Sequence, residues 1–141
     1  MYKVRVGFLA FIILCLGGCQ SRGDATLYQQ LGEEAGVEKL VDVIIQKIGN
    51  NKQILPYFKD SNISHFRKGF IQHLCSVADG PCQYTGDSMV DIHTGMHINE
   101  RDFNYVVELL IDAMTEVGLS TPVQNRVLQR LAPMRSDILL R

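Results

Sequence analysis

The sequence predicts an all-α fold of about six helices of uneven length. Its apolar residues recur with the three- and four-residue spacing of amphipathic helices, and no segment alternates like a strand. Helix-capping residues stand before the periodic segments, and glycine or proline follows them. Two of the expected helices are very short, which argues against a regular four-helix bundle.

The first half of the chain contains three expected helices and one apolar turn. Thr26 and Gln29 form a capping box for a very short helix that stops at Gly32. The next helix has the broadest apolar face and ends at residues 49–51; the face consists of Val37, Leu40, Val41, Ile44, Ile45 and Ile48. A compact turn at 54–58 precedes a helix that Ser61 or Asn62 caps and that runs to about residue 78. One side of that helix carries Phe66, Phe70, His73, Leu74 and Val77.

The second half begins with an irregular connector at residues 81–87. Asp87 or Ser88 then starts a short helix that carries His93. Asn99 with Asp102 opens a long helix that Gly118 closes; its apolar stripe consists of Phe103, Val106, Val107, Leu110, Met114 and Val117. The last helix has Thr121 as its expected N-cap, Pro122 at its first position and a kink at Pro133.

Residues 1–18 read as an export signal. Lys3 and Arg5 precede an apolar run that is too short to span a bilayer, and the run ends at Leu16-Gly17-Gly18-Cys19. That ending resembles the bacterial lipobox, in which the cysteine is acylated. We therefore expect a signal peptide over 1–18, a polar tether over 19–25 and one domain over 26–141. The alternative is a buried N-terminal helix with an incidental cysteine.

The composition of the expected mature chain limits its partners. Its net charge is −3 with neutral histidines, which gives no reason to expect nucleic acid. After export, Cys75 and Cys82 would remain as a pair in an oxidising compartment. They could form a disulfide that ties a helix end to the following loop, or remain two free thiols.

Four histidines are the candidate metal ligands: His65, His73, His93 and His97. His93 and His97 have the four-residue spacing that could hold zinc on one helix. Gly95 lies between them, so a continuous helix through both is doubtful. No Ser-His-Asp order, phosphate loop or C-x-x-C-H haem-attachment motif is present.

The region around His93 resembles the group I truncated haemoglobins. The resemblance rests on a connector, a histidine segment and flanking features: Gly80-Pro81 with Tyr84-Thr85-Gly86, Met89, His93-Thr94-Gly95-Met96-His97-Ile98, Phe103, Leu27 to Gly32, Tyr57-Phe58 and Leu131-Ala132-Pro133. It covers roughly residues 26–140. It implies two helix pairs packed two-over-two around a b-type haem.

The resemblance also implies residue roles. His93 would be the proximal iron ligand, with its other ring nitrogen donating to a backbone carbonyl; the alternative is a surface histidine. Phe58 would lie against the haem face. Met89, Ile98, Phe103 and Val107 would be walls or ordinary core. Arg67 and Tyr84 could reach the haem propionates, although Arg67 could equally lie on a solvated helix face.

The chain departs from the family on the distal side. The usual distal tyrosine falls on Ile45, and the two further distal positions fall on Phe66 and Phe70. Without donors there, we expect fast dioxygen release and comparatively strong CO or NO binding. His73 could still point inward as a donor or iron ligand, or be a core-edge histidine bonded to backbone. The family's glycine pairs are half kept, at Gly32-Glu33 and Asp79-Gly80, so helix entry angles could differ there.

The functional expectation is a haem protein that reversibly binds diatomic gas at the cell envelope. It faces the periplasm, and Gln20 after Cys19 favours the outer membrane. An enzyme that oxidises NO would need an electron donor, and an NO or redox sensor on the same haem is a further alternative. The rival from another class is a haem-free helical lipoprotein that binds another protein.

Overall fold

The computed structural model describes residues 25–139, and these residues fold into a helical sandwich. Within this range the elements are α1 (Leu27–Gln30), α2 (Glu33–Asn50), the 3-10 helix η1 (Leu55–Phe58), α3 (Ile63–Val77), α4 (Met89–His93), α5 (Glu100–Glu116), α6 (Thr121–Leu131), the 3-10 helix η2 (Ala132–Met134) and α7 (Arg135–Ile138). No strand occurs among these residues. The predicted all-α class is confirmed.

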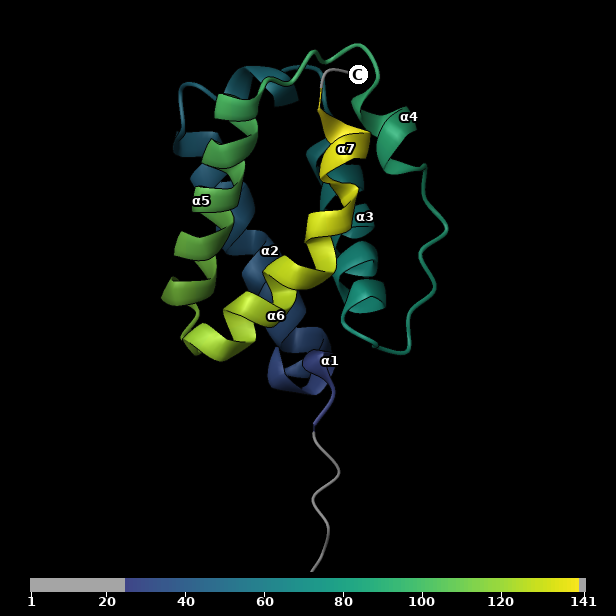
Figure 1. Ribbon diagram of the computed structural model, residues 1–141, viewed down its shortest axis with the longest axis vertical. Coiled ribbons are helices and arrows are strands. Elements are labelled where there is room, and N and C mark those ends of the chain that lie inside the picture. The colour runs from purple at the N-terminus through teal and green to yellow at the C-terminus, as the bar shows by residue number, and fades with distance from the viewer. Residues whose placement is uncertain (1–24, 140–141) are drawn as a thin grey trace, which may run out of the picture.

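Helix α2 is the centre of the packing, because it contacts α1, η1, α3 and α5. The α2–α3 pair forms one layer, and α5 with the α6–η2–α7 segment forms the other (Figure 1). The α6–η2–α7 segment runs from the α1 end of the molecule to α4 at the opposite end (Figure 1). This arrangement is the two-over-two packing of helix pairs that the sequence predicts.

The core follows the apolar faces that the sequence predicts. Helix α2 contributes five of its stripe residues as fully buried side chains, whereas Ile45 is only half-buried. The buried cluster consists of Leu27, Leu31, Val37, Leu40, Val41, Ile44, Ile48, Ile54, Leu74, Ala78, Leu110, Ala113, Met114 and Val127. Removing these side chains from water supplies the main driving force for folding.

Four predicted helix starts have the expected caps. The Gln29 backbone N–H donates to Thr26 Oγ1 over 3.2 Å, and the Thr26 N–H donates to Gln29 Oε1 over 3.0 Å, which completes the capping box. Asn62 caps α3, Ser88 caps α4 and Asn99 caps α5, each through its side-chain oxygen. Each cap satisfies a backbone donor that the first turn leaves without a partner.

The last helix differs from its prediction at one position. Its N-cap is Ser120 instead of Thr121, so Pro122 occupies the second helical position. The reason is that helical dihedrals already begin at Thr121, whereas Ser120 has extended ψ at 151°. The predicted break at Pro133 is present as the 3-10 turn η2, after which α7 continues.

The half-kept glycine pairs do not change the local backbone. Glu33 and Asp79 adopt left-handed φ values of 57° and 60°, although they are not glycines. The start of α2 packs closely against the end of α1, because a Cβ atom at Gly36 would lie 1.9 Å from the Leu31 carbonyl oxygen. A left-handed conformation costs a non-glycine residue about 1–2 kcal/mol.

The predicted signal peptide over 1–18, Cys19 and most of the predicted tether lie outside the described residues. Within 25–139, none of the helices has the length and apolar character needed to cross a membrane.

Candidate functional site

His93 is the last residue of α4 and has the geometry of a pre-oriented metal ligand. Its Nδ1 lies 2.7 Å from the Met89 carbonyl oxygen, one turn earlier in the helix. Because a carbonyl oxygen only accepts, Nδ1 carries a hydrogen, and in the neutral imidazole the lone pair is then on Nε2. No hydrogen bond to Nε2 occurs among the described residues. A bond of this kind fixes the tautomer and ring orientation of a ligating histidine.

The segment after α4 separates His93 from His97. Thr94 is the C-cap of α4, Gly95 has a φ of 84°, and His97 has a φ of 50° and is exposed. His93 and His97 therefore do not share a helix, which was the condition for a two-histidine zinc site. No cluster of three histidine, cysteine or acidic side chains that could hold a metal occurs in residues 25–139.

Three phenylalanines of η1 and α3, which are Phe58, Phe66 and Phe70, form a row of contacting rings that we call the aromatic row. The ring centroids of Phe58 and Phe66 are 5.0 Å apart at 64°, and those of Phe66 and Phe70 are 5.5 Å apart at 34°. All three rings and Ile45 are half-buried and pack against the core cluster. The row joins η1 to α3 and presents no hydrogen-bond donor.

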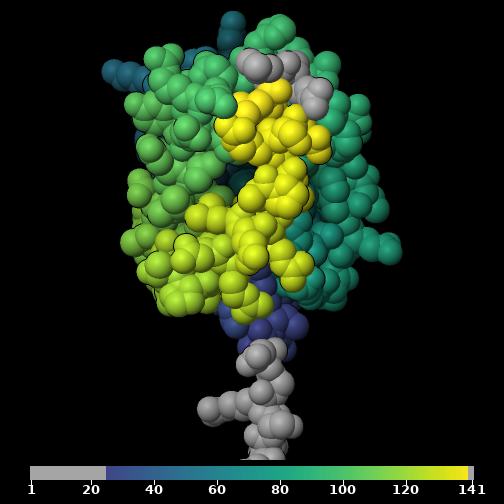
Figure 2. All heavy atoms as spheres, in the orientation of Figure 1, coloured from purple at the N-terminus to yellow at the C-terminus, as the bar shows by residue number. Residues whose placement is uncertain are grey.

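The surface is hollowed between the two layers. Figure 2 shows this hollow beside the yellow α6–η2–α7 segment, where the segment passes between α5 and α3. Ile98 is buried, and Met89, Phe103 and Val107 are half-buried. The Arg135 guanidinium lies 5.6 Å from the Phe103 ring centroid and bonds Glu100 over 2.7 Å, so α7 is tied to α5.

Arg67 on α3, a candidate for contact with a haem propionate, pairs with two acidic residues of α2. Arg67 donates to both carboxylate oxygens of Asp42, over 2.6 and 3.0 Å, and lies 3.6 Å from Glu38. Its hydrogen bond holds the pKa of Asp42 below the usual value. Arg67 thus joins α3 to α2, and its predicted reach toward a propionate stays a prediction.

His73 is buried, with 9% of its surface exposed. Neither ring nitrogen makes a hydrogen bond among the described residues, so the backbone-bonded alternative is not what the structure contains. Its ring meets the edge of the Tyr84 ring at 5.0 Å and 71°. Burial lowers the pKa of His73, which favours the neutral imidazole. The Tyr84 hydroxyl donates to the Asp87 carbonyl oxygen over 2.9 Å.

A disulfide joins Cys75, near the end of α3, to Cys82 in the connector. Cys75 is buried, and the Gly80 N–H donates to its carbonyl oxygen over 2.8 Å. A Cβ atom at Gly80 would lie 2.7 Å from Cys75 Sγ, so the turn fits glycine. The bridge holds the start of the connector that carries Tyr84 toward α4.

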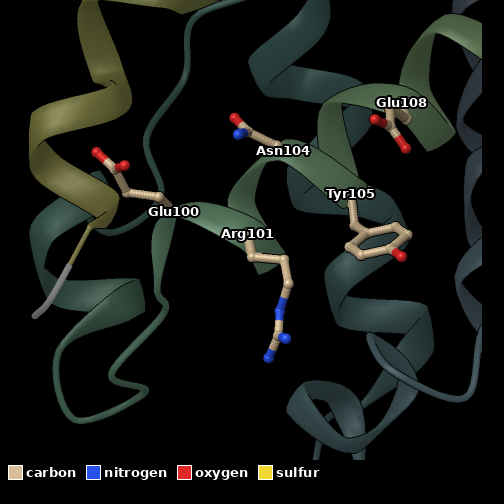
Figure 3. Close-up of a pocket in the computed structure, with 5 residues that line it drawn as sticks. All are labelled: Glu100, Arg101, Asn104, Tyr105 and Glu108. Atoms are coloured by element: carbon tan, nitrogen blue, oxygen red, sulfur yellow. The ribbon is translucent and has the colours of Figure 1, made fainter.

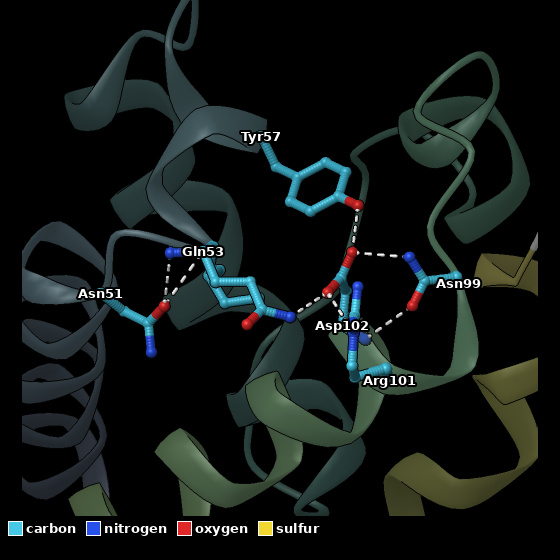
Figure 4. A network of polar contacts seen from close by, with 7 residues as sticks. Asn51, Gln53, Tyr57, Asn99, Arg101 and Asp102 are labelled. Atoms are coloured by element: carbon cyan, nitrogen blue, oxygen red, sulfur yellow. Dashed lines mark hydrogen bonds and ion pairs between the residues drawn. The ribbon is translucent and has the colours of Figure 1, made fainter.

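A buried polar network that the sequence did not reveal surrounds Asp102 (Figure 4). Its carboxylate accepts from the Tyr57 hydroxyl over 2.6 Å, from the Asn99 amide over 2.8 Å and from the Gln53 amide. The Tyr57 hydrogen bond is the main reason why the pKa of Asp102 is lowered. Only the Asn99–Asp102 capping pair was readable from spacing, since Gln53 and Tyr57 lie in another segment.

An open depression of about 540 Å³ on the outer face of α5 is not the site of chemistry. Its lining side chains all come from one helix and point apart (Figure 3): Glu100, Arg101, Asn104, Tyr105 and Glu108. Such a surface lacks the converging polar groups of a binding pocket.

The residues between the two layers fit a haem. Haem iron in globins takes a neutral histidine nitrogen, which His93 offers at Nε2. A porphyrin face requires apolar walls, which an aromatic row of this kind can supply. Sequence analysis predicts His93, Phe58, Phe66 and Phe70 as site residues. They lie in α4, η1 and α3, and their contact with haem stays a prediction.

Comparison with known proteins agrees with this description. A group 1 truncated hemoglobin from Tetrahymena pyriformis is 26% identical over 114 residues, which cover 81% of this chain and 94% of that protein. A group 1 truncated hemoglobin from Nostoc sp. is 27% identical over 115 residues, covering 82% and 98%. The crystal structure of the Tetrahymena pyriformis truncated hemoglobin in its Fe(III) form has a TM-score of 0.80, with 83% and 100% coverage.

The family model for bacterial-like globins matches residues 26–140. The match includes η1, α3, α4 and α5, which carry the aromatic row, His73, His93 and Asp102. By this match over most of its length, the chain belongs to the bacterial-like globin family.

Proposed function

We propose that the protein is a haem b globin that binds diatomic gases reversibly, releases dioxygen fast and is tethered at the cell envelope. The single observation that carries the haem assignment is His93, whose Nδ1 is committed to the Met89 carbonyl while Nε2 is left for iron. The family and its truncated hemoglobin relatives support the same cofactor and the same class of ligand. The bound haem iron supplies the coordination site for the gas.

The apolar distal side supports fast release. Three solved structures of the Tetrahymena pyriformis truncated hemoglobin are of variants in which a tyrosine or one of two glutamines is replaced, and these positions are spaced 21 and 4 residues apart. Ile45, Phe66 and Phe70 have the same spacing here. None of the three can donate a hydrogen bond to bound dioxygen, which carries partial negative charge.

The proposal predicts dioxygen release kinetics. A hydrogen bond to a charged acceptor is worth about 1.5–3 kcal/mol, so its absence corresponds to roughly 10- to 100-fold faster release. Stopped-flow measurement on the ferrous protein should show fast release that Ile45→Tyr slows about 10-fold or more. Ile45→Phe adds the ring without the hydroxyl and should leave release fast. Slow release from the wild-type protein would refute the apolar-pocket explanation.

The tether rests on the N-terminal sequence, namely the basic start, the apolar run and Leu16-Gly17-Gly18-Cys19. The arrangement of the domain is compatible with an anchor at its beginning. Helix α1 lies at one end of the molecule, and α4 lies at the other (Figure 1). A chain anchored before α1 would direct the His93 end away from the membrane.

A further inference from the structure

His73 is a buried polar side chain that the fold leaves without a hydrogen-bond partner. It is 9% exposed, and no hydrogen bond to either ring nitrogen occurs among the described residues. No side-chain nitrogen or oxygen that is itself fully buried lacks a partner among the described residues, so a ring nitrogen of His73 that makes no hydrogen bond keeps some accessible surface. An accessible nitrogen on a largely buried side chain can bond a group that occupies the adjacent space.

The position of His73 points to the haem space. It lies seven residues after Phe66 and three after Phe70, so the three side chains share one face of α3. Three residues correspond to a rise of about 4.5 Å, which places His73 beyond the aromatic row toward the C-terminal end of α3. At that end its ring meets Tyr84, which belongs to the connector that leads to α4.

The neighbouring polar groups already have partners. Arg67 bonds Asp42 across the α2–α3 interface, and the Tyr84 hydroxyl donates to the Asp87 carbonyl. The Tyr84 ring contacts the His73 imidazole edge to face, and this contact can orient the imidazole. A neutral imidazole has one N–H donor, which suits a carboxylate acceptor. Iron protoporphyrin IX carries two carboxylates, both at its rim.

We propose that His73 donates a hydrogen bond to a haem propionate at the connector end of the pocket, with Tyr84 as its positioning residue. The inference rests on the proposed haem function. It adds a polar anchor from α3 to the iron bond from His93. The anchor would slow the loss of haem without participating in gas binding.

Haem loss from the whole protein is the test. Haem uptake by the wild type is measured first, because its failure would refute the haem function itself. Transfer of ferric haem to an excess of apomyoglobin should then be about 10-fold faster from His73→Phe, the change expected for losing one charge-assisted hydrogen bond. His73→Gln keeps a donor and should remain near the wild-type rate. His65→Phe changes an exposed histidine of the same helix and should have no effect.

Reconstitution with the dimethyl ester of iron protoporphyrin IX identifies the acceptor. The ester lacks the propionate charges, so His73→Phe should no longer change the rate of loss. Equal rates for wild type and His73→Phe with ordinary haem would overturn the inference, as would an equal acceleration with the ester. A six-coordinate low-spin ferric spectrum that becomes high-spin in His73→Phe would also overturn it, because the ring would then be on iron.

Discussion

At the residue scale, the proposed haem site depends on one imidazole whose two nitrogens have different roles. The Met89 carbonyl accepts a hydrogen bond from His93 Nδ1 and so holds the ring, and in the neutral tautomer Nε2 is left for iron. The expectation that this histidine binds iron was readable from the sequence through its neighbours. Its tautomer was not, because that depends on the i–4 carbonyl meeting Nδ1 within a five-residue helix.

Replacement of His93 should therefore remove the haem. We expect His93→Gly to lose the Soret band on purification and to regain it when imidazole is added, since free imidazole can occupy the vacated position. His97→Gly changes the exposed histidine beyond α4 and should keep its haem. Absorption spectra of the two variants decide the point, and an unaltered Soret band in His93→Gly would contradict the assignment.

The ionisation of the single residue Asp102 makes the free energy of unfolding depend on pH. Tyr57, Gln53 and Asn99 stabilise its charged form, so its pKa in the folded protein lies below the unfolded value of 3.8. A group with a lowered folded pKa contributes stability that is complete above the unfolded pKa and is lost as the pH falls through the folded pKa. The network therefore ties η1 to the start of α5 at neutral pH and weakens in acid.

We predict that Asp102→Asn unfolds at lower urea concentration than the wild type at pH 7. The difference should shrink as the pH falls below 4, because the wild type then loses the stability that the variant already lacks. Asp112→Asn, an exposed change on the same helix, should not show this pH dependence. Urea midpoints measured between pH 7 and pH 3 provide the comparison, and a constant difference would refute the linkage.

At the element scale, the helix boundaries came from local chemistry and were predictable. Asn62, Ser88 and Asn99 each accept a backbone N–H, as their residue types suggest. The left-handed backbone at Glu33 and Asp79 was not predictable from these residues, because propensity argues against it. Contacts of Gly36 with Leu31 and of Gly80 with Cys75 and Tyr28 require the tight turns.

The bridge between α3 and the connector should contribute measurably to stability. Its closed loop runs from Cys75 to Cys82, for which the loss of chain entropy in the unfolded state corresponds to about 2.5 kcal/mol. Cys75→Ser with Cys82→Ser should lower the free energy of unfolding by about that amount, measured with urea. In a protein with Cys15 and Cys19 replaced by serine, thiol titration of the denatured protein without a reducing agent should find no free thiol. Two thiols per chain would refute the bridge.

At the scale of the whole molecule, α1 and α4 lie at opposite ends of the sandwich (Figure 1). We predict that the protein fractionates with membranes when expressed with its full N-terminus and that Cys19→Ser releases it. Replacing Cys15 by serine is the control, because Cys15 precedes the expected cleavage point and should not matter. Absence of labelling of the wild-type protein by a radioactive fatty acid would contradict acylation.

The sequence alone determined the all-α class and most helix starts, and it predicts His93 as the proximal histidine and an apolar distal side. These features depend on periodicity, capping and short motifs, which are local properties of the chain. The tertiary structure decided which distant groups meet: Tyr57 with Asp102, Arg67 with Asp42, and Tyr84 with His73. These contacts depend on how α2, α3 and α5 pack against one another. That packing cannot be predicted directly from the spacing of residues along the chain.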